Sequence, residues 1–335
     1  MERKAKLKLM AVVLAAAFIL LIYLELSWGS LRSLTFKEVW GALSGQSTRF
    51  KTIVIDINAT RVAIGLFVGG GLAVAGAVMQ ALFRNPMASP YILGLSSGAS
   101  VGAAIAMLFT ASSMLLFTVP LFAFISCMLT MFLVYGLSRS GTGTHMETLL
   151  LSGIAIGALM QAIVSLLTYL AGDNLSDIVF WGMGSLSGVL WKEIAIVIPL
   201  ILIGVAVAIF YSKELNAMMM GDAHAMNLGV DVKHVRFILL IFISMLTAAA
   251  VSFVGTIGFV GLVIPHIMRI VIGPDNRYLI PMSFMAGGVF LVGCDYIAHL
   301  FAQSLGVLPI GVITALIGAP YFIYLLRRRK SEVGW

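Results

Sequence analysis

The side chains of this sequence that could perform chemistry are few, and three of them lie in strongly apolar segments. His266 and Arg269 follow Pro265 in the run from Gly255 to Arg269, and Asp295 is the lone acid of a later apolar run. Ionisable groups at membrane depth are costly to bury, so they are functional candidates by default. Alternatively, Pro265 and His266 lie near the end of a span and anchor a bend, with Arg269 extending its charge to the membrane surface.

Several other chemistries lack their residues. There is no Gly-x-x-x-x-Gly-Lys-Ser/Thr phosphate loop, so we expect that the chain does not hydrolyse ATP by itself. There is no His-Glu-x-x-His motif, no nucleophile beside a base, and no cluster of metal ligands, so we expect neither a catalytic residue nor a metal site. Cys127 and Cys294 lie inside apolar segments and are expected to be small buried hydrophobic residues. The histidines, which lie far apart, are His145, His224, His234, His266 and His299.

The composition indicates an integral membrane protein. Apolar residues make up 61% of the 335 and charged residues only 10%, whereas a soluble domain has about 45–50% apolar and about 25% charged residues. A span needs about 20 apolar residues, which leaves room for roughly ten spans. Helices are the only option, because lipid cannot satisfy open backbone groups. The net charge of +7 comes mostly from the flanks of the apolar runs, so it argues for orientation and not for nucleic-acid binding.

The apolar pattern predicts an all-α integral membrane protein with about ten transmembrane helices in a single domain, residues 1–335. Small residues four apart, from Gly65 to Ala77, favour close helix packing in the second span. Thr35 and Glu38 form a capping box that predicts a short amphipathic helix to about Leu43. Residues 172–193 are expected to form a loop. The predicted spans are about 9–26, 61–82, 91–109, 115–136, 149–171, 194–211, 236–254, 256–272, 280–301 and 308–326.

Ten spans would place both termini on one side of the membrane. With the N-terminus inside, most of the 21 Lys and Arg lie on inside segments, which is the bias that sets orientation. We therefore expect both termini in the cytoplasm, together with residues 213–236. A chain of nine or eleven spans would break this assignment. The eighth span is the least regular, because its glycines and Pro265 weaken a helix.

Residues 213–236 are the only substantial polar interruption in the second half of the chain. Asn216 could cap a short helix towards Leu228, and Gly229 would end that helix, because glycine adopts the left-handed conformation at low cost. Asp231 stands where the cap of the next helix belongs. The methionines here form a soft apolar face that suits docking into a groove of another protein or rests against the bilayer. They are Met218, Met219, Met220 and Met226.

The order of residues from Gly221 to Val230 resembles the coupling loop of the FecCD-type permeases. These are the membrane subunits of bacterial ABC importers for iron–siderophores, haem and cobalamin. The run from Gly255 to Arg269, followed by Gly273–Arg277, is similar to the most recognisable motif of that family. Other similar segments occur in order over about residues 60–325, and they are Gln80–Ala88, Leu93–Ala99, Leu151–Ala155, Trp181–Leu186 and Leu308–Pro320.

The resemblance implies the fold of a cobalamin-importer permease, a type II ABC importer, in the cytoplasmic membrane of a bacterium. It implies a pathway between two copies of this chain, or between this chain and a homologue. Two ATPase subunits carrying ATP and Mg would power transport of an iron–siderophore or similar metal chelate, and an extracytoplasmic binding protein would deliver it. This chain itself would bind no cofactor. The residues matching the ATPase-coupling loop are Gly221, Asp222, Ala223, His224, Ala225, Asn227, Leu228 and Gly229.

The resemblance also suggests residues for gating and docking. An Asn-Pro loop that helps close the cytoplasmic gate in relatives matches Asn85 and Met87, although Asn85 could simply satisfy backbone groups beside Pro86. The family docks its binding protein through outer arginines; of these Arg61 remains here, and His299 occupies a second such position. The residues of the span-eight motif are Gly258, Gly261, Pro265, His266 and Arg269.

Departures from the family pattern leave alternatives for docking and for function. Val307 stands where a glutamate is common, and Arg49 or Lys51 could serve in docking beside Arg61. Asp295 could be a proton or cation site of a transporter driven by an ion gradient, working with the broken eighth span. The family often has Asp at this place without ion coupling, so we favour a structural role. An intramembrane enzyme would lack a second catalytic group. The ligand and the identity of the second permease stay open.

Overall fold

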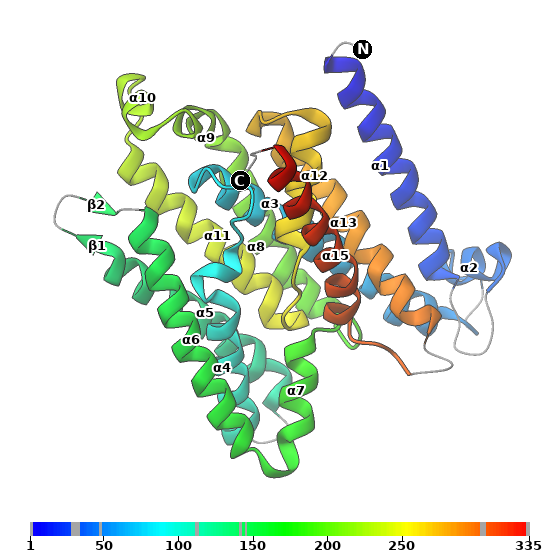
Figure 1. Ribbon diagram of the computed structural model, residues 1–335. Helices are drawn as coiled ribbons and strands as arrows, with labels where there is room; N and C mark the ends of the chain where they lie inside the picture. Colours follow the sequence, from blue (N-terminus) through cyan, green and yellow to red (C-terminus); the bar gives the residue numbers. More distant parts are fainter. Residues whose placement is uncertain are drawn as a thin grey trace.

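The computed structural model describes residues 3–27, 34–46, 49–110, 114–140, 143–144, 146–301 and 306–332. Within these ranges the chain is a bundle of helices (Figure 1). A π-type helix, η1 (Thr52–Asn58), leads directly into α3. The long helices are α1 Arg3–Leu26, α3 Ala59–Leu82, α5 Leu115–Ser138, α6 Met146–Tyr169, α8 Trp191–Phe210, α11 Val232–Val254, α13 Asn276–Leu300 and α15 Ile310–Glu332.

Shorter elements connect or interrupt the long helices. Helix α2 begins with the predicted capping box, in which Glu38 Oε2 accepts a hydrogen bond from Thr35 N at 2.8 Å. The shorter helices are α2 Phe36–Leu43, η2 Pro90–Leu93, α4 Leu95–Phe109, η4 Gly172–Asn174, α7 Leu175–Met183, α9 Ser212–Met219, α10 Asp222–Asn227 and α12 Val260–Ile272. Two antiparallel two-residue strands, β1 Arg139–Ser140 and β2 Gly143–Thr144, join α5 to α6.

The described helices confirm an all-α membrane fold. By length and composition, seven of them could cross a membrane, and α3 does so together with η1 as one helix over Thr52–Leu82. Three shorter apolar helices, Leu95–Phe109, Val260–Ile272 and Ile310–Leu325, fall at the remaining predicted spans. Ten is therefore an approximate count of crossing helices.

Two predicted spans are broken. The third, predicted over about 91–109, is interrupted at Gly94, whose φ of 72° ends the regular helical conformation. The eighth, predicted over about 256–272, is helical only from Val260, because Gly255 and Phe259 have φ angles of 73° and 66°. In lipid, non-helical backbone is tolerated where protein or a cavity surrounds it. Both breaks therefore belong inside the bundle.

The predicted loop over residues 172–193 is wrong in part, because it contains α7. The glycine and serine residues on both sides of this helix favoured the prediction of a loop. A signal was present, since Asp177 lies in the first turn of α7, where the helix dipole favours an acid.

Helix α3 lies at the centre of the bundle, and 83% of the most apolar stretch of Thr52–Leu82 is buried. Its small residues allow the predicted close approach: the backbone of Gly69 meets that of Gly287 in α13, and the backbone of Gly76 meets that of Gly261 in α12. A Cβ atom at Gly69 or Gly76 would clash with the facing carbonyl oxygen. The core is thus built on backbone contacts around α3.

The two ends of the bundle carry different elements. Helices α9 and α10, the start of α1 and the end of α15 lie toward the top of Figure 1, and α7 lies toward the bottom. Helix α2 lies at the far end of α1. We call the end with α9 and α10 the α10 end, and the opposite end, with α7 and α2, the α2 end. Both chain termini therefore lie toward the end that carries residues 213–236.

Candidate functional site

The polar stretch at the α10 end folds into two short helices. Gly221 separates α9 from α10 with a φ of 121°, a conformation that glycine adopts at low cost. Gly229, with a φ of 83°, ends α10 as predicted. Asp231 caps α11 as predicted, because its Oδ1 accepts from His234 N at 3.1 Å. Local residues therefore fix the shape of this segment.

The predicted helix cap at Asn216 is wrong. Asn216 lies inside α9, where its Nδ2 donates to Asp275 Oδ1 at 2.7 Å and its Oδ1 accepts from Asn276 N at 2.9 Å. The Arg277 guanidinium also donates to Asp275, at 2.7 Å, and holds the pKa of that carboxyl well below its usual range. Asn216 thus fastens α9 to the start of α13.

The surface around α10 is exposed and partly apolar. Met220, Met226 and Leu228 have exposed fractions of 72%, 58% and 63%, whereas Ala225 is fully buried. The predicted methionine face is divided, because Met218 is buried in the core. Exposed apolar groups that lie together suit a docking surface. The other exposed coupling residues are Ala223, His224, Asn227 and Gly229.

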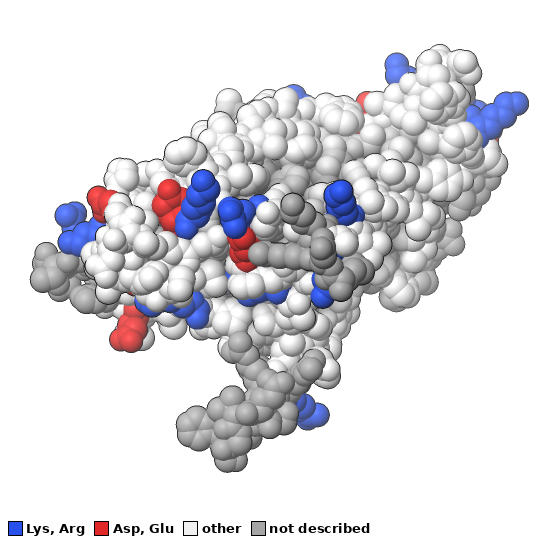
Figure 2. Space-filling view, turned by 90° about the horizontal axis from the view of Figure 1, so that it is seen from above, with Lys and Arg blue, Asp and Glu red and all other residues white. Residues whose placement is uncertain are grey.

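Asp222 connects α10 to two other parts of the molecule. Its Oδ2 accepts from Arg236 Nη2 of α11 at 2.6 Å, and Arg84 Nη2 lies 3.7 Å from its Oδ1. The Arg236 side chain is 8% exposed, whereas those of Arg84 and Asp222 are 46% and 37% exposed. Seen from this end, acidic and basic side chains are interspersed over the surface (Figure 2).

The turn after α3 carries the predicted gate residues. Asn85 is exposed, and its Oδ1 accepts from Met87 N at 2.9 Å. This bond supports the alternative in which Asn85 satisfies backbone groups beside Pro86. Met87 is half-buried. Arg84, directly before Asn85, has a φ of 49°, which is uncommon for a residue other than glycine. The turn thus reverses sharply beside Asp222.

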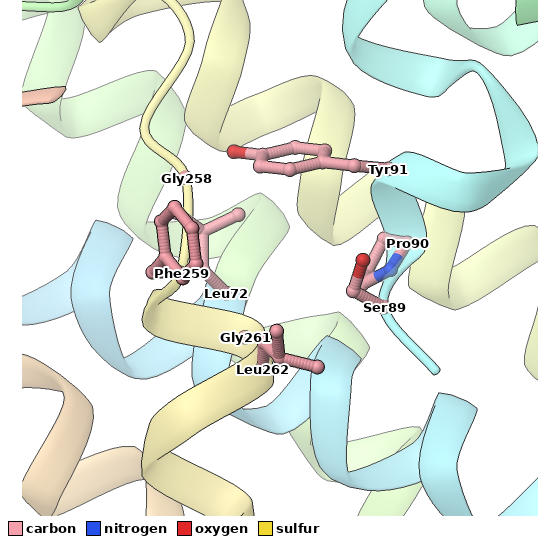
Figure 3. Close-up of a pocket in the computed structure, with 8 residues that line it drawn as sticks. All are labelled: Leu72, Ser89, Pro90, Tyr91, Gly258, Phe259, Gly261 and Leu262. Atoms are coloured by element: carbon pink, nitrogen blue, oxygen red, sulfur yellow. The ribbon is translucent and has the colours of Figure 1, made fainter. Parts of the chain in front are cut away.

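The chain beyond this turn faces the second broken span. Tyr91 Oη donates to Ile257 O at 2.6 Å. A cavity of about 190 Å³ lies between the two segments, with Tyr91 and Phe259 on its walls (Figure 3). Gly258 and Gly261 of the predicted span-eight motif also line it. The start of η2 therefore meets the non-helical part of the eighth span.

The rest of the span-eight motif lies in α12. Pro265 is buried and His266 is half-buried. Arg269 lies in the last turn of α12, and its Nη1 is 3.7 Å from the Met219 sulfur of α9. Pro265 and His266 lie in the middle of α12 and Arg269 Nε and Nη2 are buried, so the geometry does not support the alternative in which Pro265 and His266 lie near the end of a span and Arg269 extends its charge to the membrane surface.

Four ionisable side chains, which we call the Arg61 cluster, meet at the α2 end. Arg61 Nη2 lies 2.6 Å from Asp295 Oδ2, 3.0 Å from Glu25 Oε2 and 2.7 Å from His299 Nδ1. Arg61 is 3% exposed, and the other three residues are buried as well. The cluster joins α1, α3 and α13.

This burial contradicts the prediction that Arg61 and His299 dock a binding protein. Docking residues must reach the partner, whereas both side chains face acidic groups inside the chain. The ion pair with Arg61 supports a structural role for Asp295. Arg49 and Lys51 are exposed, so they stay candidates for docking.

Sequence reasoning missed the roles of Glu25, Arg84 and Arg236. Glu25 was available as a lone acid in an apolar run, and Arg84 as the charge next to an Asn-Pro turn. The sequence did not indicate which residue either side chain would pair with. Among the residues that the structure describes, no group of three or more His, Cys, Asp or Glu is placed to hold a metal ion. His145 lies outside the described residues.

These features define a class. A bundle of membrane-crossing helices, with two broken spans facing a cavity and an exposed short helix at one end, is typical of multi-pass transport proteins. Residues 17–328 match the FecCD transport family, so the chain belongs to this family and is a membrane permease of the ABC-importer type.

Curated relatives cover most of the chain. It is 44% identical over 280 residues to the cobalamin import system permease protein BtuC of Halobacterium salinarum, covering 84% of this chain and 74% of that one. It is 37% identical to the hemin transport system permease protein HmuU of Yersinia pestis, covering 95% and 97%. It is 36% identical to the Fe(3+) dicitrate transport system permease protein FecD of Escherichia coli, covering 83% and 86%.

Solved structures agree on the fold. A chain described as an inward-facing conformation of a metal-chelate type ABC transporter superposes with a TM-score of 0.86 at 28% identity, covering 96% of this chain and 99% of that one. A second chain, from PsaBC of Streptococcus pneumoniae in complex with Fab, has a TM-score of 0.56 at 16% identity and covers 85% and 94%. At this lower identity the likeness concerns the fold alone.

Proposed function

We propose that this chain is the membrane-spanning subunit of an ATP-driven importer that translocates a metal chelate. Within that class we propose an iron–siderophore or a similar compound. The observation that carries the proposal is the surface of α10. It is exposed and partly apolar, it is bound through Asp222 to α11, and it lies next to the turn after α3. An ATPase cleft that receives α10 would cover Met226 and Leu228.

The relatives support the chelate class. Their names refer to cobalamin, hemin and Fe(3+) dicitrate, each of which is a metal ion held by an organic ligand. The chain would accept such a compound from an extracytoplasmic binding protein. Selection among chelates would rest mainly with that protein, and exposed Arg49 and Lys51 are the candidate docking residues on this chain.

The complete importer would contain two ATPase subunits with ATP and Mg, and a second copy of this chain or a homologue. No nucleic acid is part of it. It would reside in the cytoplasmic membrane of a bacterium with the α10 end inside. The position of both termini toward that end and the bias of Lys and Arg support this orientation (Figure 1). Each permease would bind one ATPase subunit at residues 213–236, and this chain would bind no cofactor.

The test is gentle extraction from the native membrane followed by mass spectrometry of the proteins that remain bound. We expect an ATPase with a phosphate loop, at one copy per permease. Met226→Asp combined with Leu228→Asp should abolish its recovery, because the change places charges in an apolar contact. Arg327→Gln, near the end of α15, is the matched control at the same end and should retain it.

A different outcome would replace the proposal. Recovery of this chain alone, still active in uptake without ATP, would indicate transport driven by an ion gradient. In that case an uncoupler would abolish uptake at constant ATP. An ATPase that still binds the Met226→Asp, Leu228→Asp variant would exclude α10 as its docking surface.

A further inference from the structure

Arg84 lies between the end of α3 and the start of α10. The backbone of its turn is fixed to α3, since Arg84 N donates to Ala81 O at 3.2 Å and Asn85 N donates to Gln80 O at 3.1 Å. The side chain extends the other way, toward Asp222. The turn is therefore attached to α3 by its backbone and to α10 by one side chain.

Gly221 flanks the same guanidinium. A Cβ atom on Gly221 would lie 3.8 Å from Arg84 Nη1. The start of α10 therefore meets the turn through two neighbouring residues, Gly221 by proximity and Asp222 by charge.

The two ion pairs of Asp222 differ in character. The Arg236 contact is short, at 2.6 Å, and its arginine is nearly buried, so it holds α10 firmly to α11. The Arg84 contact is longer, at 3.7 Å, and both side chains reach solvent. Such a pair adds little to stability, and it can open and close without unfolding either helix. Movement of α10 would therefore carry Asp222 with α11 and change its distance to Arg84.

Residues on both sides of the turn form hydrogen bonds with the broken eighth span. Tyr91 donates to Ile257 O in the non-helical part of that span, and Gln80, just before the turn, donates from Nε2 to Leu262 O at 3.0 Å. Tyr91 and Leu262, one partner in each bond, line the cavity between the two segments (Figure 3). A shift of the turn would therefore be felt where the two broken spans meet.

We propose that the Arg84–Asp222 ion pair is the connection through which α10 positions the turn at residues 84–88. The inference rests on the proposed function, in which an ATPase holds α10. Arg84 is a positioning residue: it sets where Asn85 and Met87 lie in response to α10, and it does not contact the transported compound. Its loss leaves ATP hydrolysis in place and disconnects it from the turn.

The test follows the turn directly and needs no transported compound. Met87→Cys provides a reporter for N-ethylmaleimide in the complete complex with its ATPase, because the native Cys127 and Cys294 are buried. Labelling rates are compared without nucleotide and after trapping with ATP and vanadate. We expect the two rates to differ about fivefold or more, the usual range of coupling between sites.

Arg84→Gln in this reporter should bring the two rates together while the ATPase still assembles and hydrolyses ATP. Arg84→Lys, which keeps the charge, should restore part of the difference. Arg327→Gln is the control, because it removes another exposed arginine at this end, near the end of α15 and outside residues 213–236. In an Asp222→Asn background, Arg84→Gln should have no further effect, because the charge that Arg84 pairs with has already been removed.

The outcomes separate the two proposals. If no ATPase assembles with the unmodified chain, the proposed function fails. If it assembles and the reporter responds equally with Arg84 in place and in the Arg84→Gln variant, the ion pair carries no signal and this inference is overturned while the proposed function stands. A reporter that does not respond while Arg84 is in place also overturns it, because the turn then does not move. An additional loss from Arg84→Gln in the Asp222→Asn background would assign Arg84 another partner.

Discussion

Two groups of charged side chains lie at opposite ends of the bundle, and they differ in their access to water. In the Arg61 cluster, Glu25 is 0% exposed, Arg61 3% and Asp295 4%. At the α10 end, the side chains of Arg84 and Asp222 are 46% and 37% exposed. The buried group joins three membrane-spanning helices, whereas the exposed pair joins a short helix to a turn.

The difference in burial separates two tasks. Removing one partner of a buried ion pair is strongly destabilising, because a charge is left without compensation in a medium of low dielectric constant. An exposed pair is worth about 0–1 kcal/mol and exchanges readily with water. The Arg61 cluster therefore suits a fixed joint between α1, α3 and α13. The Arg84–Asp222 pair suits a contact that changes during a transport cycle.

The largest effect is expected from Arg61→Met. This change leaves Glu25 and Asp295 buried without their cation, and it should lower the free energy of unfolding by about 3–5 kcal/mol. Thermal unfolding of the purified protein in detergent measures it. Arg49→Met is the control at the same end, because Arg49 is exposed and its loss should change stability by less than about 0.5 kcal/mol. Equal melting temperatures for the two variants would show that the cluster is not a fixed joint.

Asp222→Asn should have an intermediate effect on stability. It removes the charge from a short hydrogen bond to Arg236, and bonds to charged groups are worth about 1.5–3 kcal/mol. The same melting experiment measures it, with Asp222→Glu as the variant that keeps the charge. A melting temperature as low as that of Arg61→Met would place Asp222 with the buried group.

Arg84→Gln should change the free energy of unfolding by at most about 1 kcal/mol, because the pair that it removes is half-exposed. It should nevertheless abolish the response of the Met87→Cys reporter. A large loss of stability, with loss of the assembled ATPase, would mean that Arg84 fastens the fold in the way that Arg61 does.

The smallest effect is expected from salt. Raising the ionic strength from about 0.1 M to 1 M shortens the Debye length from about 10 Å to about 3 Å, which weakens exposed pairs much more than buried ones. The reporter response should shrink in the complex that keeps Arg84 and stay flat in Arg84→Gln. The stability difference between Arg61→Met and the unmodified protein should not change. A salt-dependent difference there would indicate that water reaches the cluster.

Features encoded by neighbouring residues were predictable from the sequence. The capping box of Thr35 and Glu38, the helix end at Gly229 and the cap at Asp231 each depend on a few adjacent positions. The apolar runs likewise predicted the membrane fold, because span length and backbone satisfaction leave helices as the choice.

Features that join distant residues were not predictable in this way. Arg61 and Asp295 are 234 positions apart, and the sequence marked one as a docking residue and the other as an isolated acid. Asn216 has the side chain of a helix cap, but its amide instead donates to Asp275 and accepts from Asn276. Polar side chains with several suitable local roles are decided by tertiary neighbours, which a single sequence does not reveal.

The glycine contacts of α3 also limit how the molecule can deform and how its sequence can change. Side chains can switch rotamers, but where the backbone of Gly69 meets that of Gly287, and the backbone of Gly76 meets that of Gly261, nothing is present that could rearrange. Helices α3, α12 and α13 therefore have little room to approach one another more closely at these contacts. Few residues of α1 are buried, so most of its positions can change with little effect on packing. These four positions can change only if both facing helices move apart together.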